Sequence, residues 1–310
     1  MTAQTFRHEV AFYEDADDYL ATTIPFLREG LEAGEPALVA VGPAKTALLR
    51  GELGTDAERV RFENIEEFGR NPARIIPAWR DFVDDQERPG SGFRGIGEPV
   101  WLGRDSAEID ECQRHESLLN VAFGDGPGWA LLCPYDSGAL PDPVLAATLH
   151  SHPHIAGENG DGSPSPAWGE NDCPDPFAGE VPARPGDAPE IRYDVAALHE
   201  LRGFAARAAA EAGLSDQRAE DLIFAASELA ANSVVHGGGS GCASAWRESG
   251  ALLFETRDHG RIEEPLVGRV RPDPTQPKGR GLWMANQLCD LVQIRSSDAG
   301  TAVRLRVALD

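Results

Sequence analysis

The sequence predicts two domains of different fold class. The first half is predicted to be α/β, with helices around a mostly parallel sheet, because short apolar runs alternate with helix-like stretches up to residue 156. The second half is predicted to be α+β, with helices on one face of a mixed or antiparallel sheet, because two helix-like stretches precede its strand-like segments. Residues 157–190, between the halves, are rich in proline and glycine.

This middle segment predicts the domain boundaries. It carries seven prolines and six glycines without an apolar period, so it cannot bury enough surface to fold alone. We expect a linker or an extended strap at 157–190, between a domain at 1–156 and a domain at 191–310. Trp168 and Phe177 indicate that parts of the strap pack on a neighbouring domain.

The first half contains an alternating series of elements. Residues 36–41 are a short apolar run typical of a buried strand, and a helix-like stretch follows at 44–53. Residues 75–83 have helical spacing, 130–133 are a second candidate buried strand, and 143–150 are a candidate helix. Strands interleaved with helices favour a mostly parallel sheet.

The second half begins with two predicted helices. Asp194 is a favourable N-cap for a helix that continues to about Ala212, where Gly213 ends it. Ser215 caps a second helix that continues to His236, before three consecutive glycines. The remaining elements are expected as strands at 242–247 and 252–258, a polar loop at 259–278, a helix at 282–288, and strands at 291–295 and 302–309 joined by a turn at 298–300.

Composition excludes several classes of function. The chain has 310 residues, with 51 acidic against 28 basic side chains and a formal net charge of −23. This charge repels nucleic-acid phosphates and anionic lipid, so neither nucleic acid nor a membrane is an expected partner. No window approaches the roughly 20 apolar residues of a membrane span, and the N-terminus has no secretion-signal pattern. We expect a cytoplasmic protein.

The cysteines are expected to be reduced. They are Cys112, Cys133, Cys173, Cys242 and Cys289. Their number is odd, and no pair has the spacing of metal ligands. The sequence therefore predicts free thiols rather than disulfides or a zinc site.

Three motifs in the second half belong together. Glu228, Asn232 and His236 recur at every fourth position, which places them on one face of the second helix. Asp258-His259-Gly260 ends a predicted strand. Gly279-Arg280-Gly281 begins a helix, whose exposed N–H groups and dipole favour phosphate. Each motif alone is usually a solvated helix face or a turn, but their combination in this order is specific.

This combination resembles the ATP-binding domain shared by gyrase, heat-shock chaperones, histidine kinases and anti-sigma serine kinases, the GHKL superfamily. The resemblance covers residues 195–310. SELAANSVVHGG is similar to the N box, TRDHG to the first glycine box and KGRGLWMANQLCD to the second, and Gly300-Thr301 to the closing strand motif. The resemblance implies the Bergerat fold, an α+β sandwich, with ATP and Mg²⁺ as cofactors.

The resemblance also implies roles by position. Asn232 would bind the Mg²⁺ that bridges the ATP phosphates, a hard cation that needs few protein ligands. Asp258 would accept the adenine amino group, and Glu228 would be the catalytic general base for an attacking hydroxyl. The implied cofactor-binding residues are Asn232, His236, Asp258, Gly260, Gly279, Arg280, Gly281 and Thr301.

The loop between the two glycine boxes has a role of its own in this family. Residues 261–278 would form a lid over the phosphates, while Gly279 and Gly281 would donate backbone N–H groups and Thr301 would hydrogen-bond near the adenine. The chain departs from the family at one position, because Ile262 stands where the first glycine box often has a second glycine. This departure argues against tight nucleotide binding but does not remove the adenine-binding Asp258, and it leaves open whether kinase activity is retained.

His199 raises the alternative of a sensor histidine kinase. The segment LHELR around it resembles the phosphoacceptor box of such kinases. Only 33 positions separate His199 from Asn232, which leaves no room for the long helical hairpin that a histidine kinase needs there. The same segment is better interpreted as the first amphipathic helix of the ATP domain itself.

The remaining type is the compact anti-sigma serine kinase. LRGFAARAAAEAGLSDQRAEDLIFAASELAANSVVHGGG and PLVGRVRPD resemble actinobacterial members of that group. This resemblance implies a stress-response regulator of transcription that sequesters a sigma factor and phosphorylates a serine of an anti-anti-sigma (STAS) protein. The alternative function is that of a non-catalytic module, in which ATP or a sensory ligand controls the binding of a sigma factor or a STAS partner. A homodimer is one assembly that the resemblance allows.

The first half resembles the MEDS sensory domain, which is related to the RecA/KaiC fold. The motifs that carry this resemblance within residues 8–154 are HEVAFY at 8–13, GLEAGE at 30–35, GE at 97–98 with Trp101, LCPYD at 132–136 and HP at 152–153. The family implies a small-molecule ligand. Residues 42–46 (GPAKT) lie where a RecA fold has its phosphate loop, but they lack the first glycine, so a vestigial loop is favoured over a working ATPase site.

Several polar residues of the first half are candidates for that ligand site. The set is His8, Glu98, His115, Glu116, Tyr135 and His152, each of which is equally interpretable as a structural polar group. The alternating His150, His152 and His154 suggest a metal. Without a partnering cysteine nearby in the sequence, they are better interpreted as a helix end and a loop.

Overall fold

The computed structural model describes residues 6–85, 92–124, 128–157, 162–169, 175–273 and 279–309. It contains two compact units, Met1–Pro174 and Asp175–Asp310. The division falls inside the segment predicted as a linker. Cys173, one of the five cysteines, lies outside the described residues, and the other four are free thiols.

Unit 1 is built on a mostly parallel sheet. Its strand order is β3-β2-β4-β5-β1-β6-β7, and every pair is parallel except β6 with β7. The strands are β1 (Arg7–Tyr13), β2 (Ala37–Val41), β3 (Val60–Asn64), β4 (Arg94–Gly97), β5 (Ala130–Asp136), β6 (His154–Ile155) and β7 (Ser163–Pro164). The continuous apolar runs of β2 and β5 suit a sheet that is covered on both faces. This confirms the predicted α/β class.

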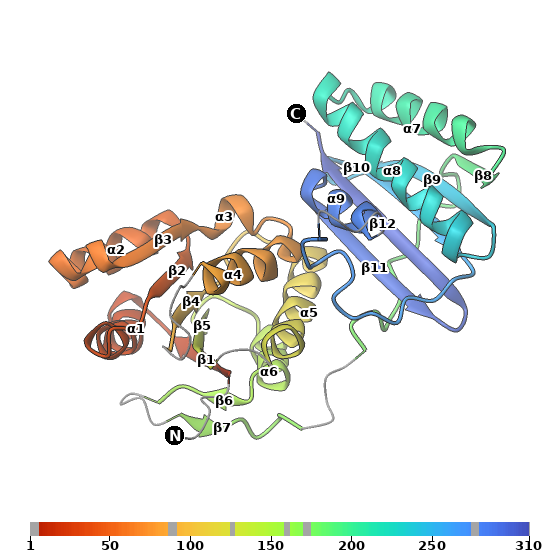
Figure 1. Cartoon of the computed structure of the whole chain (residues 1–310). Helices are drawn as coiled ribbons and strands as arrows, with labels where there is room; N and C mark the ends of the chain where they lie inside the picture. Colours follow the sequence, from red (N-terminus) through yellow and green to blue (C-terminus); the bar gives the residue numbers. More distant parts are fainter. Residues whose placement is uncertain are drawn as a thin grey trace. The chain divides into compact units, whose positions relative to one another are not determined.

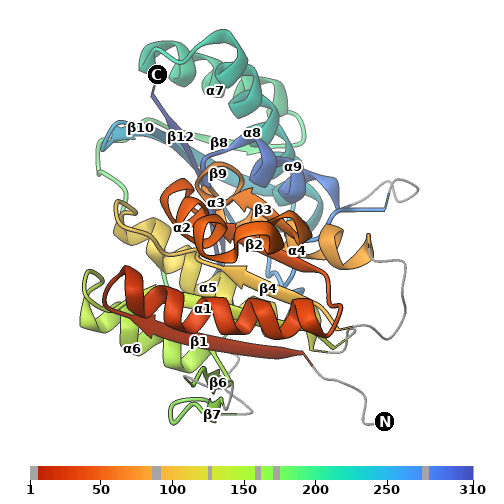
Figure 2. The same cartoon turned by 90° about the vertical axis from the view of Figure 1, so that its left-hand side faces the viewer.

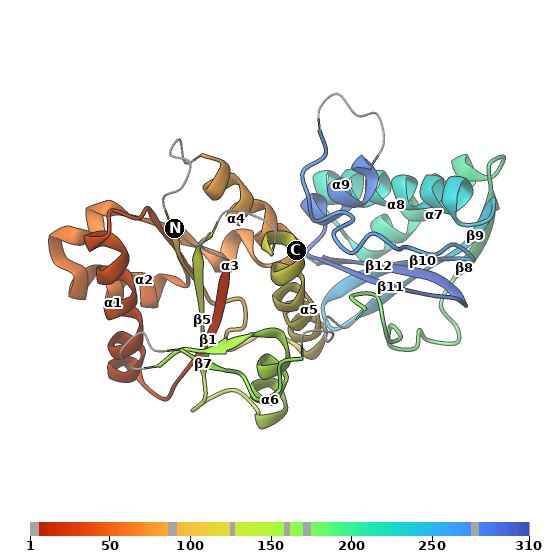
Figure 3. The same ribbon diagram turned by 60° about the horizontal axis from the view of Figure 1, so that its bottom comes forward.

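Helices cover both faces of this sheet (Figure 3). They are α1 (Ala16–Glu32), α2 (Pro43–Leu53), α3 (Ile65–Phe68), α4 (Ile75–Asp84), α5 (Ser106–Phe123) and α6 (Asp142–Ser151), with 3-10 turns at Gly54–Arg59 and Pro72–Arg74. Leu27 of α1 packs with Val39 and Leu132 on one face. On the other face, Trp79 of α4 lies beside Gly95. Figure 2 shows α1 running alongside β1.

Unit 2 has an antiparallel sheet with helices on one face (Figure 1). The strand order is β11-β12-β10-β9-β8, with antiparallel pairing throughout. The strands are β8 (Glu190–Asp194), β9 (Ser240–Glu248), β10 (Ala251–Asp258), β11 (Leu291–Ser297) and β12 (Gly300–Ala308). Four of these match the predicted strands, while β8 was not predicted because its sequence, EIRYD, has only a weak apolar alternation. This confirms the predicted α+β class.

The helices of unit 2 are α7 (Leu198–Ala212), α8 (Asp216–His236) and α9 (Arg280–Leu288). Leu201 of α7, Leu229 of α8 and Phe254 of β10 share one buried core. Gly213 caps α7 in a left-handed conformation, as predicted. The prediction that Asp194 caps α7 was wrong, because pairing with β9 keeps Asp194 extended and the N-cap is Ala197.

The residues before β8 form an extended segment on the sheet face opposite the helices. This segment, 175–189, is named the strap, and Figure 3 shows it in green below the sheet of unit 2. Phe177 of the strap is only 5% exposed and belongs to the core of unit 2. Its carbonyl accepts a hydrogen bond from the Ser296 N–H, and the Pro182 carbonyl accepts one from Arg304. The strap is therefore part of the folded unit.

None of the described helices is long and apolar enough to cross a membrane.

Candidate nucleotide-binding site

A pocket of about 300 Å³ opens between the helices and the sheet of unit 2. Its walls are α8, α9, the ends of β10 and β12, and the loop that follows β10. Seven of the predicted cofactor-binding residues line it: Asn232, His236, Asp258, Gly260, Gly279, Gly281 and Thr301. The structure thus brings together motifs that are up to about 70 positions apart in the sequence.

Asp258 is the most firmly held polar group in this pocket. Its Oδ2 accepts a hydrogen bond from the Ser233 hydroxyl at 2.6 Å, and its Oδ1 accepts one from the Gly260 N–H at 2.8 Å. Tyr193 donates to the Ser233 hydroxyl at 3.0 Å, which completes a short chain of hydrogen bonds behind the carboxylate. Burial raises the pKa of Tyr193 to about 12, so its hydroxyl remains a donor near neutral pH. Each carboxylate oxygen keeps a further lone pair for a ligand.

Two glycines allow the backbone to approach Asp258 closely. A Cβ on Gly237 would lie 2.4 Å from Cγ of Asp258, and a Cβ on Gly260 would lie 2.6 Å from the His236 carbonyl oxygen. Any side chain at either position would therefore push the end of β10 away from the end of α8. These contacts explain why both turns contain glycine.

Thr301 fixes the loop that carries Gly260. Its hydroxyl donates to the Gly260 carbonyl at 2.8 Å and lies 2.7 Å from the Ser296 hydroxyl. Ser296 in turn accepts a hydrogen bond from the Ile262 N–H at 2.8 Å. Three polar groups thus hold the first residues of the loop against the sheet.

Glu228 and Asn232 lie together at the start of α9. A Cβ built on Gly281 would meet Glu228 Oε2 at 2.9 Å and Asn232 Nδ2 at 3.2 Å. Both side chains therefore point at the glycine-rich turn, as expected for residues one helical turn apart on the same face. Gly279 caps α9 with a positive φ of 89°, and Gly279 and Gly281 both line the pocket. The first N–H groups of a helix have no partner within the helix, so they are suited to an anion.

Two predicted site residues have weaker positions. His236 lines the pocket but is exposed at the end of α8, and Arg280 is exposed and is not one of the lining residues. Ile262 lines the pocket and packs against the core of unit 2. Part of the predicted lid, 274–278, lies outside the described residues.

The described part of the lid is anchored to α9. The Asn286 side chain donates a hydrogen bond to the Gly268 carbonyl at 2.9 Å. Gly268 has a positive φ of 71°, and a Cβ there would lie 2.9 Å from Cβ of Leu282. The conformation therefore requires glycine at this position, which belongs to the PLVGRVRPD segment.

A larger cavity, about 840 Å³, lies between the strap and the opposite sheet face. Asp258 and Thr301 also reach its rim, but Asn232 and Gly281 do not. Of these two pockets in the described residues, the smaller combines the carboxylate, the helix face and the turn before α9, which makes it the candidate nucleotide site.

In unit 1, the six candidate ligand-site residues are buried but do not form a single group. Glu98 pairs with the Lys45 ammonium and accepts a hydrogen bond from the Tyr13 hydroxyl at 2.7 Å. Lys45, the lysine of the predicted vestigial phosphate loop, is thus already neutralised. His8, Glu116 and His152 form a second cluster, described below.

The alternating histidines at the end of α6 are separated by the fold. His150 is exposed in the last turn of α6, whereas His152 is fully buried. His154 lies in β6. Among the described residues they do not form a metal-binding group with one another.

Comparison with known families identifies both halves. Residues 7–153 match the model of the MEDS family, described as the methanogen/methylotroph, DcmR sensory domain. Residues 191–307 match the model of the histidine kinase-like ATPase domain. The chain joins a MEDS domain to a histidine kinase-like ATPase domain. The ATPase domain contains the pocket described above, and membership of this family implies ATP binding.

Other comparisons add less. No curated protein matches the chain. Among solved structures, one match is the crystal structure of the RsbU and RsbW domains of Rv1364c from Mycobacterium tuberculosis, with 22% identity and a TM-score of 0.30. That match covers 39% of this chain and 32% of the other, so the chain spans about a third of that structure's length.

Sequence reasoning missed several residues of the pocket. The hydroxyl groups of Tyr193, Ser233 and Ser296 support Asp258 and the loop that follows it. Hydroxyl residues are common, and the family resemblance implies no role for any of these three positions. Of these three, only Ser233 could have been found from the sequence, because it directly follows Asn232 on the helix predicted to face the nucleotide. Cys133, in unit 1, was missed because its neighbours come from distant parts of the chain.

Proposed function

We propose that this protein is a sensor-coupled anti-sigma regulator. In this proposal the ATPase domain binds Mg²⁺-ATP, sequesters a sigma factor and phosphorylates a serine of an anti-anti-sigma (STAS) protein. One observation carries it: Asn232, Asp258 and the glycine turn of α9 line a single pocket, and Glu228 lies against that turn at Gly281. The MEDS domain provides the sensory half.

The pocket suits Mg²⁺-ATP in its donors and acceptors. Asp258 offers an anchored acceptor for the adenine amino group, and the first N–H groups of α9 suit phosphate oxygens. Asn232 supplies a neutral oxygen ligand for Mg²⁺, which retains several waters in such sites. When bound, Mg²⁺-ATP would supply the transferable phosphoryl group and neutralise its charge.

Glu228 is the proposed general base. It lies against Gly281, one helical turn from Asn232, where its carboxylate can accept the proton of a serine hydroxyl. Phosphoryl transfer depends mainly on positioning and charge neutralisation, so a base in a fixed position beside the phosphate turn is what the reaction requires.

The position of α7 supports a serine kinase over a histidine kinase. Leu201 and Phe204 of α7 are buried in the core of the ATPase domain. His199 is exposed near the start of the same helix and lies within that domain rather than in a separate helical hairpin.

A sigma factor with a basic surface would also complement a chain of net charge −23.

One observation favours the non-catalytic alternative. Ile262 lines the pocket at the position where the family often has a glycine. An apolar side chain there would favour a module in which ATP or a sensory ligand only gates the binding of a sigma or STAS partner.

Labelled phosphate transfer tests the proposal. The full-length protein is incubated with γ-labelled ATP and each STAS protein of the same genome. We expect acid-stable label on one STAS serine, lost in Glu228→Gln and retained in Glu220→Gln, an exposed residue of the same helix. Bound ATP without transfer to any STAS protein would favour the gated module. Acid-labile label on the chain itself that disappears in His199→Ala would instead establish a histidine kinase.

A further inference from the structure

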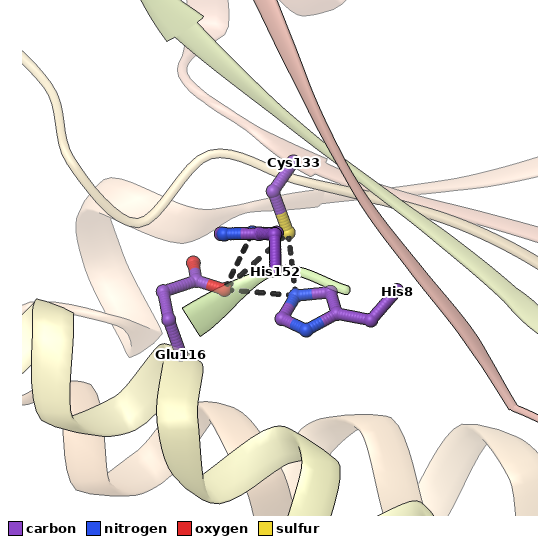
Figure 4. A group of neighbouring side chains, drawn as sticks. All are labelled: His8, Glu116, Cys133 and His152. Atoms are coloured by element: carbon purple, nitrogen blue, oxygen red, sulfur yellow. Dashed lines mark hydrogen bonds and ion pairs between the residues drawn. The ribbon is translucent and has the colours of Figure 1, made fainter. Parts of the chain in front are cut away.

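Four buried side chains of unit 1 point toward one another (Figure 4). His8 comes from β1, Glu116 from α5, Cys133 from β5 and His152 from the residue that follows α6. All four are at most 1% exposed, and one ligand-type atom from each lies within 4.8 Å of the others. This group lies outside the ATPase domain, and the proposed phosphotransfer does not use it.

The separations within this group are short and similar. Oε2 of Glu116 lies 3.0 Å from Nε2 of His8 and 3.3 Å from Nε2 of His152. Sγ of Cys133 lies 3.4 Å from Nε2 of His8 and 3.5 Å from Oε2 of Glu116. A tetrahedral metal ion with bonds of 2.0–2.3 Å places its ligand atoms about 3.3–3.7 Å apart. Four of the six separations are thus close to the tetrahedral values, and the other two do not exceed 4.8 Å.

Hydrogen bonds outside the group orient the ring of His152. Its Nδ1 lies 2.8 Å from the Thr148 carbonyl oxygen, which can only accept, so Nδ1 carries the proton. Nε2 then presents a lone pair toward Glu116 when the ring is neutral. A neutral ring therefore donates nothing to Oε2 of Glu116, which lies 3.3 Å from Nε2.

His8 is oriented in the same way. Its Nδ1 lies 3.2 Å from Oδ1 of Asn120, while the amide nitrogen of Asn120 donates to the Ser151 carbonyl at 2.7 Å. The second bond fixes the Asn120 amide with its oxygen toward His8, so His8 Nδ1 is the donor. Both imidazoles therefore direct Nε2 inward, and a carbonyl or amide oxygen holds the outer N–H, as is usual for metal-binding histidines.

This arrangement needs positive charge at its centre. With neutral rings, two nitrogen lone pairs and a carboxylate oxygen face one another in a space closed to water, which is unfavourable. The Cys133 thiol, 3.5 Å from Oε2 of Glu116, has one proton to donate, and protonating a single ring leaves the Nε2 lone pair of the other ring facing the group. Protonating both rings would bury two cations whose ring centroids are 4.1 Å apart against one carboxylate. A single bound cation would satisfy all the inward-facing atoms.

We propose that His8, Glu116, Cys133 and His152 bind one divalent transition-metal ion, and that Zn²⁺ fits this ligand set best. Two imidazoles, a thiolate and a carboxylate are ligands that Zn²⁺ takes in tetrahedral geometry, whereas Mg²⁺ and Ca²⁺ require oxygen. Binding displaces the Cys133 thiol proton to solvent. Because all four positions are filled by protein, the ion holds β1, α5, β5 and the end of α6 together.

Metal content of the intact chain tests this proposal first. Untagged full-length protein is purified from cells supplied with Zn²⁺, and its metals are measured by mass spectrometry. We expect about one Zn²⁺ per chain. After chelation, the thermal midpoint of the protein should fall and Zn²⁺ should restore it. Protein without bound metal that also fails to take up Zn²⁺ or Co²⁺ would overturn the proposal.

Cobalt identifies the ligands. Co²⁺ in the site should give a thiolate-to-metal charge-transfer band, because Cys133 supplies a sulfur ligand. The band should be lost in Cys133→Ser and retained in Cys112→Ser. Cys112 is the matched control because it is equally buried but donates a hydrogen bond to the Pro99 carbonyl. A parent spectrum without that band, or an unchanged band in Cys133→Ser, would overturn the assignment. The parent spectrum decides the question even if a variant does not fold.

Discussion

At the scale of single residues, the nucleotide pocket depends on contacts that keep Asp258 in one position. Two hydrogen bonds hold its carboxylate oxygens, and Gly237 lies so close that no Cβ fits between Gly237 and Asp258. Gly237, which has no side chain to offer a ligand, therefore helps to fix the position of Asp258, the proposed adenine acceptor. Such a residue can be tested separately from the acceptor itself.

We predict that Gly237→Ala weakens ATP binding by about tenfold or more. The added Cβ would displace the Asp258 carboxylate, and about 1.4 kcal/mol of lost interaction corresponds to a factor of ten. Titration calorimetry with Mg²⁺-ATP measures the change. Gly239→Ala is the matched control, because Gly239 has a positive φ of 91° but no atom within 4 Å of a Cβ. This control should lose some stability and keep its affinity. Because Gly237 has a negative φ of −98°, its substitution adds no left-handed backbone strain. Equal affinity losses in both variants would therefore contradict the role given to its close approach to Asp258.

At the scale of elements, the strap and the sheet of unit 2 depend on one buried ion pair. Nε and Nη2 of Arg304 on β12 donate to Oε2 of Glu255 on β10 at 2.9 and 2.6 Å. Nη2 also donates to the Pro182 carbonyl of the strap at 2.6 Å. Glu255 and Arg304 are 2% and 4% exposed.

We predict that Glu255→Gln lowers the free energy of unfolding of this unit by about 3–5 kcal/mol. The substitution leaves the Arg304 charge buried without its counter-ion, which is the costly way to break such a pair. Chemical denaturation measures the loss. Glu211→Gln, on the exposed face of α7, should change stability by less than about 0.5 kcal/mol. A loss of similar size in both variants would contradict this account.

The strap itself is predicted to stabilise the ATPase domain. A fragment of 175–310 should exceed a fragment of 191–310 in free energy of unfolding by roughly 2–4 kcal/mol, from burial of Phe177 and the Arg304 bond to the strap. Phe177→Ala in the longer fragment should reproduce much of the loss. If the two fragments unfold at the same denaturant concentration, the strap contributes no stability.

At the scale of the whole molecule, the sequence predicts local features well and long-range contacts poorly. The apolar runs at 36–41 and 130–133 and the glycine after Ala212 identify elements because their physical causes are local. The helix cap predicted at Asp194 does not form, since pairing with β9 imposes an extended conformation on this residue. A cap preference of about 1 kcal/mol does not outweigh a strand pairing.

The two sites show the same contrast. The nucleotide pocket could be predicted because its residues occur in ordered motifs, and the family match supports their grouping. In unit 1, His8, Glu116 and His152 were among the six predicted candidates, but their grouping with Cys133 could not be predicted, because the four residues come from segments up to 144 positions apart. Sequence spacing gives no sign of ligands that only the tertiary fold brings together.

The pocket between α8 and α9 is proposed to bind Mg²⁺-ATP through Asn232. Calorimetry of the full-length protein with ATP, with and without Mg²⁺, tests it most directly. We predict that the parent and Gln217→Ala, at the far end of α8, bind equally, and that Asn232→Ala loses about tenfold or more in affinity for Mg²⁺-ATP while remaining folded. If Asn232→Ala binds Mg²⁺-ATP as tightly as the parent, this face of α8 is a solvated surface and the assignment of the pocket is wrong.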